Sequence, residues 1–295
     1  MDEKRLYTKE KRNIIDRCNI CGQLTGLTWD HVPPKFCFNN QKIKYNSLME
    51  INKKEIKKQI SQNGIRYRSI CSKCNNELLG SDYDKEYKKL VDILYKLYIT
   101  PGEIGQFIEI HGIKINKVAR AIVGHFLAAR NEYFAGKGED ELREYFLNPN
   151  LKPPKEFSLL YYVYIYNTIM IIRDVVPKKL GNLEYAIPEG LLSCINSFPV
   201  AFILAYKCDN KSELYDMFEL CTENIDETVN MKVDLLSYMY PNKKRLKNPF
   251  WPCNVSNDET GTSIMLVSDK CNSSVFSQVR ELKNDRVLKN DILNK

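Results

Sequence analysis

Residues 18–21 read Cys-Asn-Ile-Cys and residues 71–74 read Cys-Ser-Lys-Cys, so the sequence holds two CxxC pairs with 49 residues between them. The other six of the ten cysteines have no close partner in the sequence, and we expect them to be buried as small hydrophobic residues. Two CxxC turns can direct four thiolates at one ion and complete a tetrahedral zinc site with no open position. The sequence therefore predicts a structural zinc ion bound by Cys18, Cys21, Cys71 and Cys74. The alternative is a pair of unrelated reduced thiol turns, or a redox-active CxxC.

A second group of polar residues lies between the two pairs and directly after them. Residues 28–35 read Thr-Trp-Asp-His-Val-Pro-Pro-Lys, and Asn75 follows the last cysteine of the second pair. Hydrolysis of a phosphodiester needs a base to activate water and a divalent cation to stabilise charge on the phosphate. Histidine can act as that base near neutral pH, and aspartate and asparagine oxygens suit Mg²⁺. The residue types at Asp30, His31 and Asn75 therefore fit this chemistry. The alternatives are a packed histidine in a zinc ribbon that only binds nucleic acid, and a helix N-cap at Asn75.

This arrangement resembles the HNH endonucleases, also called His-Me finger or ββα-metal nucleases, and is most similar to their zinc-bound branch, which includes endonuclease VII. The resemblance covers about residues 12–95 and rests on CxxC, Asp-His-Val-Pro-Pro-Lys and CxxC-Asn in that order. It implies that His31 is the general base and that Asp30 and Asn75 bind a catalytic Mg²⁺ or Mn²⁺ ion. The third histidine of the family motif would fall at Leu79. The chain thus resembles those members that bind the metal through aspartate and asparagine alone.

Basic side chains are concentrated near the N-terminus. The chain carries 44 Lys and Arg against 37 Asp and Glu, and residues 1–75 alone hold 16 basic against 7 acidic side chains. A basic module on a near-neutral body indicates a polyanionic partner, although a lysine-rich composition alone gives the same bias. We predict that the partner is nucleic acid, expected to be double-stranded DNA. The candidates for phosphate contacts are Lys35, Lys54, Lys57, Lys58, Arg66 and Arg68. The alternative for these side chains is a solvated face.

The expected fold class is α+β, with two parts. Residues 1–100 are expected to form a zinc-stabilised ββα-metal module, and residues 101–295 a mixed helical and strand extension. Within the module, the pattern predicts strands over 24–32 and 64–70, a helix that opens at Asn75 and breaks at Gly80–Ser81, a longer helix from Asp82 to about Ile99, and a basic helix over 51–60.

The extension carries no second catalytic motif. We predict that it binds DNA, forms a homodimer, or restrains the nuclease until a regulatory protein or ligand arrives. His125 is expected to be a core or surface residue and not a ligand. The elements that the pattern predicts are a helix over 117–133, strands over 157–176 and 191–206, a short helix over 214–221, a loop over 241–260, and a tail after Phe276 that is either a polar helix or disordered.

Membrane and secreted classes are not expected. No stretch reaches the ~18 uninterrupted apolar residues of a membrane span. The N-terminus begins Asp2-Glu3-Lys4-Arg5 after the first methionine and has no apolar segment of the kind found in secretory signals. We therefore predict no membrane association and a cytoplasmic location.

The sequence leads to two hypotheses. The first is a Mg²⁺-dependent HNH endonuclease with a structural zinc ion, of the kind found in bacterial antiviral defence or in mobile elements. The second is a non-catalytic zinc-dependent module that binds nucleic acid or protein. The joint presence of Asp30, His31 and Asn75 favours the first, because a pure binding module does not need all three.

Overall fold

The protein has a mixed α+β fold, which confirms the expected class at this level. The structure, a computed structural model, describes residues 12–40, 43–46, 59–100, 107–166, 168–175, 189–209, 214–235 and 276–280. Its strands are β1 (Ile15–Arg17), β2 (Leu24–His31), β3 (Ile43–Asn46), β4 (Gln59–Ser61), β5 (Arg66–Cys71), β6 (Phe107–Ile113), β7 (Phe157–Val163), β8 (Thr168–Val175), β9 (Glu189–Ser197), β10 (Val200–Asp209), β11 (Tyr215–Asp216), β12 (Val229–Asp234) and β13 (Phe276–Arg280). Its helices are η2 (Lys35–Cys37), η4 (Lys73–Tyr83), α1 (Asp84–Ile99), α2 (Ile115–Ala128), α3 (Lys137–Leu147) and η5 (Phe218–Leu220).

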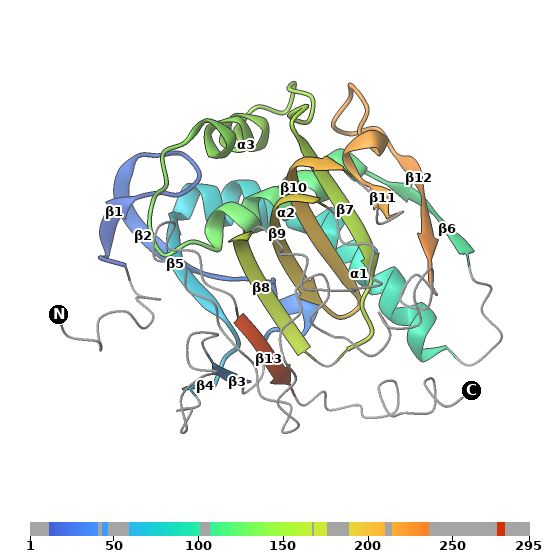
Figure 1. Ribbon diagram of the computed structural model, residues 1–295, viewed down its shortest axis with the longest axis horizontal. Coiled ribbons are helices and arrows are strands. Elements are labelled where there is room, and N and C mark those ends of the chain that lie inside the picture. Colours follow the sequence, from blue (N-terminus) through green and yellow to red (C-terminus); the bar gives the residue numbers. More distant parts are fainter. Residues whose placement is uncertain are drawn as a thin grey trace.

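The strands form antiparallel sheets, and the largest lies at the centre of the molecule (Figure 1). Its order is β11-β7-β10-β9-β8-β13-β3-β4. Strands β7, β9 and β10 are rich in Val, Ile, Leu and Tyr, residues that pack well on a pleated surface. β9 and β10 form a hairpin whose turn contains Phe198. Helices α1 and α2 lie against this sheet (Figure 1), and the ring of Tyr87 on α1 meets that of Phe202 on β10 edge-on, with centroids 5.6 Å apart.

A smaller sheet, in the order β1-β2-β5, carries the sequence motifs. β2 pairs with β5 over Leu27 to His31, and one irregularity in register lies between Thr28 and Trp29. β5 ends at Cys71, and the chain turns directly into η4. The two strands expected for the module are therefore present, within two residues of their expected ends.

The expected helix break at Gly80–Ser81 is wrong. The chain runs without a break from η4 into α1, because η4 is a π-helix that absorbs the two residues in a wider turn. The backbone N–H of Asp84 donates to the carbonyl of Leu79, and the Ser81 hydroxyl donates to the carbonyl of Asn76 at 2.7 Å.

Three further predictions differ from the structure. Residues 214–221 form the short strand β11 and the 3-10 helix η5 in place of a helix, because Asp216 accepts backbone N–H bonds from Leu159 and Phe218 and so ties the segment to β7. The start of the expected helical or disordered tail is strand β13, which pairs with both β8 and β3. The expected basic helix over 51–60 is wrong at its end, because Gln59 and Ile60 belong to strand β4, which pairs with β3. Its residues 51–58 and the expected loop at 241–260 lie outside the described residues.

One hydrophobic cluster joins the two expected parts of the chain. It contains Ile20 from the turn between β1 and β2 and Tyr67 from β5, and it continues through α1 and α2 to Phe202 on the central sheet. α2 is buried along nearly its whole length. A Cβ atom on Gly124 would lie 2.5 Å from Phe146 and 2.7 Å from Leu79, so only glycine allows α2 to approach α3 and η4 this closely. In the described parts, no helix has the length and apolar character to cross a membrane.

Candidate metal centre and active site

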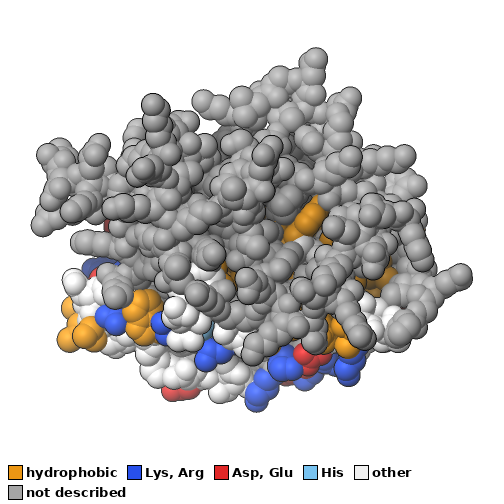
Figure 2. Space-filling view, turned by 90° about the horizontal axis from the view of Figure 1, so that it is seen from below, with side chains coloured by type: hydrophobic (Ala, Val, Ile, Leu, Met, Phe, Trp, Pro, Cys, Tyr) orange, Lys and Arg blue, Asp and Glu red, His pale blue; other side chains and the backbone are white. Residues whose placement is uncertain are grey.

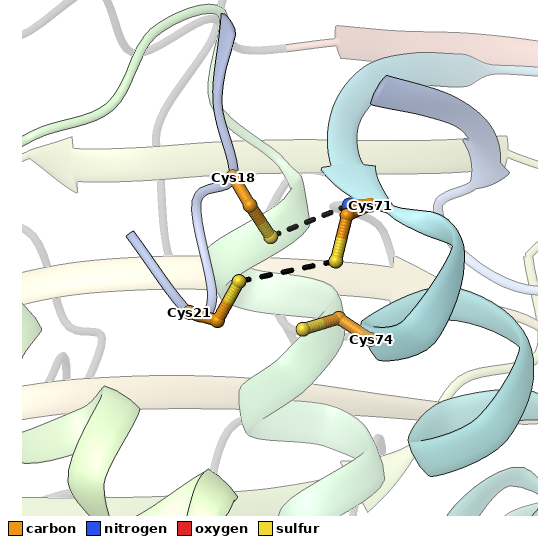
Figure 3. Close-up of side chains that lie close together, drawn as sticks. All are labelled: Cys18, Cys21, Cys71 and Cys74. Carbon is orange, nitrogen blue, oxygen red and sulfur yellow. Dashed lines mark hydrogen bonds between the residues drawn. The ribbon is translucent and has the colours of Figure 1, made fainter. Parts of the chain in front are cut away.

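The four cysteines of the two CxxC pairs converge on one point (Figure 3). Cys18 and Cys21 lie in the turn between β1 and β2, Cys71 ends β5, and Cys74 is in the first turn of η4. Their sulfur atoms all lie within 4.8 Å of one another. The sulfurs of Cys21 and Cys71 are 3.8 Å apart, much farther than the ~2.05 Å of a disulfide. All four are free thiols, and together they can hold a metal ion.

The electrostatics of this cluster favour a cation. The Cys74 thiol donates to the Cys18 sulfur, which lowers the pKa of Cys18 to about 5. The backbone N–H of Cys71 also donates to that sulfur, at 3.3 Å. Burial raises the pKa of Cys21 to about 11, and the Cys18 sulfur together with burial raises the pKa of Cys74. A negative charge on the Cys18 sulfur therefore disfavours ionisation of the other thiols in the cluster. A bound cation reverses this effect, because it stabilises several thiolates at once.

The first cysteine turn is attached to the C-terminal end of α2. The amide of Asn19 donates to the carbonyls of Leu127 and Arg130, both at 3.1 Å. The hydroxyl of Ser69 donates to the carbonyl of Ala128 at 2.6 Å. These bonds satisfy carbonyls that the helix end leaves without intrahelical partners. The cysteine cluster is thus held in place by a helix from the expected extension.

Asn75 lies beside β2. Its amide donates to the hydroxyl of Thr28 at 3.0 Å and to the carbonyl of Trp29 at 3.2 Å. Both amide hydrogens are therefore used, and within the described residues no donor reaches the Asn75 Oδ1 atom. That oxygen is available as a ligand beside the strand that carries Asp30.

Asp30 is nearly buried and faces the helices. Its carboxylate Oδ2 lies 3.3 Å from Nδ1 of His125, an ion-pair contact without hydrogen-bond geometry. The other ring nitrogen of His125, Nε2, lies 2.9 Å from Oδ1 of Asp84. Burial opposes a charge on His125, but Asp84 and Asp30 outweigh it and raise the pKa of the ring to about 10. His125 is a core residue, one of the two placements expected for it, but its contact with a candidate metal ligand was not predicted.

The sequence contains only one indication of the contact between His125 and Asp30. His125 is a polar residue on the apolar face of an amphipathic helix, and such a residue needs a polar partner when it is buried. The sequence does not say which partner that is.

His31 lies at the end of β2, on the opposite side of the strand from Asp30 because side chains alternate along it. Its Nε2 atom lies 3.0 Å from the carbonyl of Asn63. A carbonyl can only accept, so this nitrogen carries the hydrogen and the neutral ring keeps Nδ1 as an acceptor. Burial and the nearby Lys35 lower the pKa of His31, which favours the neutral ring near pH 7.

Two of the predicted phosphate contacts are next to His31. Arg66 pairs with His31 and Arg68 pairs with Trp29 across the β2–β5 ladder. Both guanidinium groups lie near the Trp29 ring, 5.4 Å and 4.7 Å from its centroid, a cation–π arrangement that restrains them. No acidic side chain of the described residues forms an ion pair with either arginine.

Of the other predicted phosphate contacts, only Lys35 lies within the described residues. Lys35 begins η2, just after the two prolines, and is exposed. Lys54, Lys57 and Lys58 lie outside the described residues. Figure 2 shows one face of the molecule on which Lys and Arg side chains predominate over acidic ones along the edge of the described surface.

Comparison with protein-family models, curated proteins and solved structures finds no match.

Proposed function

We propose that the protein is a metal-dependent endonuclease of the HNH type, built on a zinc-stabilised ββα-metal module. One observation carries the proposal. A four-cysteine cluster joins the start of β2 to the start of η4, and Asn75 of η4 is hydrogen-bonded to the strand that carries Asp30 and His31. These are the three residues whose chemistry metal-dependent phosphodiester hydrolysis needs.

The metal of the cysteine cluster is zinc, held by Cys18, Cys21, Cys71 and Cys74. Zinc takes four thiolates at about 2.3 Å in a tetrahedron, for which the sulfurs lie about 3.8 Å apart. The separation of the Cys21 and Cys71 sulfurs matches this value. Four cysteines leave no open position for water or substrate, so this zinc ion stabilises the fold and takes no part in hydrolysis.

His31 is the general base. The carbonyl of Asn63 fixes its ring and leaves Nδ1 free to accept a proton from water. Its lowered pKa keeps the ring in the neutral form that a base requires.

Asp30 and Asn75 are the residues that hold the catalytic metal, Mg²⁺ or Mn²⁺. The donor set fits such an ion, since it consists of the Asp30 carboxylate and the Asn75 amide oxygen, which no donor reaches within the described residues. When bound, such an ion stabilises negative charge on the phosphate and on the leaving oxygen.

The substrate is nucleic acid, and we favour double-stranded DNA. Arg66 and Arg68 present two restrained cations beside His31 and bind backbone phosphates without reading sequence. Lys35, which is exposed just after the Asp-His pair, is a further candidate for a phosphate contact. Lys54, Lys57 and Lys58, outside the described residues, remain candidates from the sequence. A single site of this kind cuts one strand, so double-strand cleavage requires a homodimer or two successive nicks. The family resemblance alone favours a cytoplasmic role in antiviral defence or in a mobile element, with a homodimer or a regulatory protein as partner.

The decisive experiment is nicking of supercoiled plasmid by the purified full-length protein with Mg²⁺ or Mn²⁺. We expect cutting that EDTA abolishes and that His31→Ala abolishes without loss of zinc or of DNA binding. The matched control is His111→Ala, which removes an exposed histidine on β6. Cutting by His31→Ala at the wild-type rate would refute the assigned mechanism.

The second candidate is a non-catalytic zinc-dependent module that binds nucleic acid or protein. It shares the cysteine cluster and the basic face, so zinc content does not distinguish the two. A folded, zinc-loaded protein that binds DNA but never cuts it would favour this candidate.

A further inference from the structure

Asp30 contacts a buried histidine that lies far from it in the sequence. His125 of α2 is 1% exposed and lies between two carboxylates. One ring nitrogen faces Asp30 at 3.3 Å, and the other faces Asp84 at the start of α1 at 2.9 Å. Together the three side chains connect β2, α2 and α1.

We propose that His125 is a positioning residue that sets the orientation of the Asp30 carboxylate for metal binding. This inference rests on the proposed function, in which Asp30 is a metal ligand. His125 itself does not contact the metal or the substrate. It acts by fixing one oxygen of the carboxylate and leaving the other oxygen to the ion.

The geometry supports orientation and not merely packing. The His125 ring is hydrogen-bonded through Nε2 to Asp84, on the side away from Asp30, and this bond orients Nδ1 toward the Asp30 carboxylate. The helix that carries it is itself anchored, because Asn19 and Ser69 bind the carbonyls at its C-terminal end. His125 thus contacts Asp30 of β2, while Asn75 of η4 is hydrogen-bonded to Thr28 and Trp29 of the same strand.

This arrangement gives the extension a direct role in the active site. α2 lies beyond the residues expected to form the nuclease module, yet it supplies a contact to a catalytic ligand. Partners that hold metal-binding groups in place commonly affect metal affinity by about 10- to 100-fold.

Two nearly isosteric variants of the full-length protein test the contact of His125 with Asp30 separately from its contact with Asp84. The amide nitrogen of asparagine lies near the position of histidine Nδ1, so His125→Asn keeps a donor toward Asp30 and loses the one toward Asp84. The amide nitrogen of glutamine lies near the position of Nε2, so His125→Gln does the reverse. Binding of Mn²⁺ without DNA, followed by electron paramagnetic resonance, provides a readout that does not depend on cutting. Zinc content and the unfolding temperature report whether each variant is folded.

We expect His125→Gln to bind Mn²⁺ about tenfold more weakly than the wild type. We expect His125→Asn to remain within about threefold of it. Wild-type affinity in a folded His125→Gln, or equal losses in both variants, would overturn the inference.

An Asp30→Asn variant distinguishes failure of the inference from failure of the proposed function. If Asp30→Asn weakens Mn²⁺ binding and His125→Gln does not, the inference alone is wrong. If neither Asp30→Asn nor His125→Gln changes Mn²⁺ binding, the proposed metal site is wrong and the inference falls with it.

A measurement on the wild-type protein keeps the inference testable if His125→Gln does not fold. The chain has only three histidines, so their ring nitrogen signals can be assigned by nuclear magnetic resonance. Added Mg²⁺ should shift the signals of His125 and leave those of exposed His111 unchanged. A His125 ring that does not respond to saturating Mg²⁺ would overturn the inference.

Discussion

Asn39 connects two segments of the chain at the end of the candidate site through hydrogen bonds of its side chain. Its amide donates to the carbonyls of Pro33 and Ile65, and its Oδ1 accepts the backbone N–H of Ile65. It therefore ties the turn after His31 to the start of β5. Gly64 packs directly on Asn39 with a φ of +71°, a conformation that side chains disfavour. Asn63, which precedes Gly64, provides the carbonyl that fixes the His31 ring.

We predict that Gly64→Ala destabilises the protein and reduces nicking. A Cβ atom at this position would lie 2.2 Å from the Asn39 carbonyl oxygen, and the backbone would also be strained. We expect a loss of about 2 kcal/mol or more in the free energy of unfolding, measured by denaturant titration. Gly26→Ala is the matched control, because nothing lies within 4 Å of its added Cβ. Equal stability of the two variants would contradict this account.

The cysteine cluster allows a second prediction at the level of single residues. Cys71→Ser should abolish stoichiometric zinc binding and lower the unfolding temperature, because a structural zinc ion contributes free energy to folding. Metal analysis and thermal unfolding measure the two effects. Cys194→Ser, which alters a buried cysteine on β9 outside the cluster, should retain one zinc ion per chain. Zinc at full occupancy in Cys71→Ser would refute the four-cysteine site.

At the level of elements, a buried charged network joins the end of α2 to α3 and the central sheet. Arg130 and Arg173 both bind Glu139 of α3 and also contact Asp174 of β8. Ser193 of β9 donates to the Asp174 carboxylate at 3.2 Å. Such a network is costly to break, since removal of one charge leaves its partners buried without compensation.

This network predicts how stability depends on pH. Burial alone would raise the pKa of Asp174, but Arg173 and Arg130 outweigh it and hold the pKa below its usual range. The charged carboxylate therefore stabilises the fold above the unfolded-state pKa of about 3.9, and this contribution is lost as the pH falls through the lower folded-state value.

The variant Asp174→Asn tests this dependence. It should lower the free energy of unfolding at pH 7 by about 3 kcal/mol and make the decline below pH 4 shallower than in the wild type. Urea titrations at a series of pH values provide the measurement. Asp92→Asn, which removes one partner of an exposed ion pair with Lys88, should have little effect. If the free energy of unfolding declines below pH 4 as steeply in Asp174→Asn as in the wild type, this role of Asp174 is excluded.

At the level of the whole molecule, the cysteine module and the extension share a core. Asn19 and Ser69 depend on carbonyls of α2, and the buried face of α1 packs on α2. We predict that residues 1–100 expressed alone show no cooperative unfolding transition even with zinc, because their apolar surface would be left without its partner. Thermal unfolding followed by circular dichroism, with the full chain as the reference, measures this. A cooperative, zinc-dependent transition in the fragment would show instead that the module folds independently.

The sequence alone determined the features that depend on local spacing. A CxxC turn directs two thiolates to the same side whatever surrounds it, so two such pairs were enough to predict the four-cysteine cluster. The alternation in residues 24–32 and 64–70 predicted β2 and β5, and the position of Asn75 directly after Cys74 predicted that it lies close to the Asp-His strand. The assignment of catalytic roles to Asp30, His31 and Asn75 remains a prediction.

Only the tertiary structure decided the contacts between segments that are distant in the sequence. The ion pairs of His125 with Asp30 and Asp84, the attachment of Asn19 to α2 and the pairing of β13 with β3 and β8 have no local signature. The reason is physical. A buried polar side chain must find a partner, but which partner it finds depends on how helices and sheets pack, and here Gly124 lets α2 approach closely enough for its histidine to lie between two carboxylates.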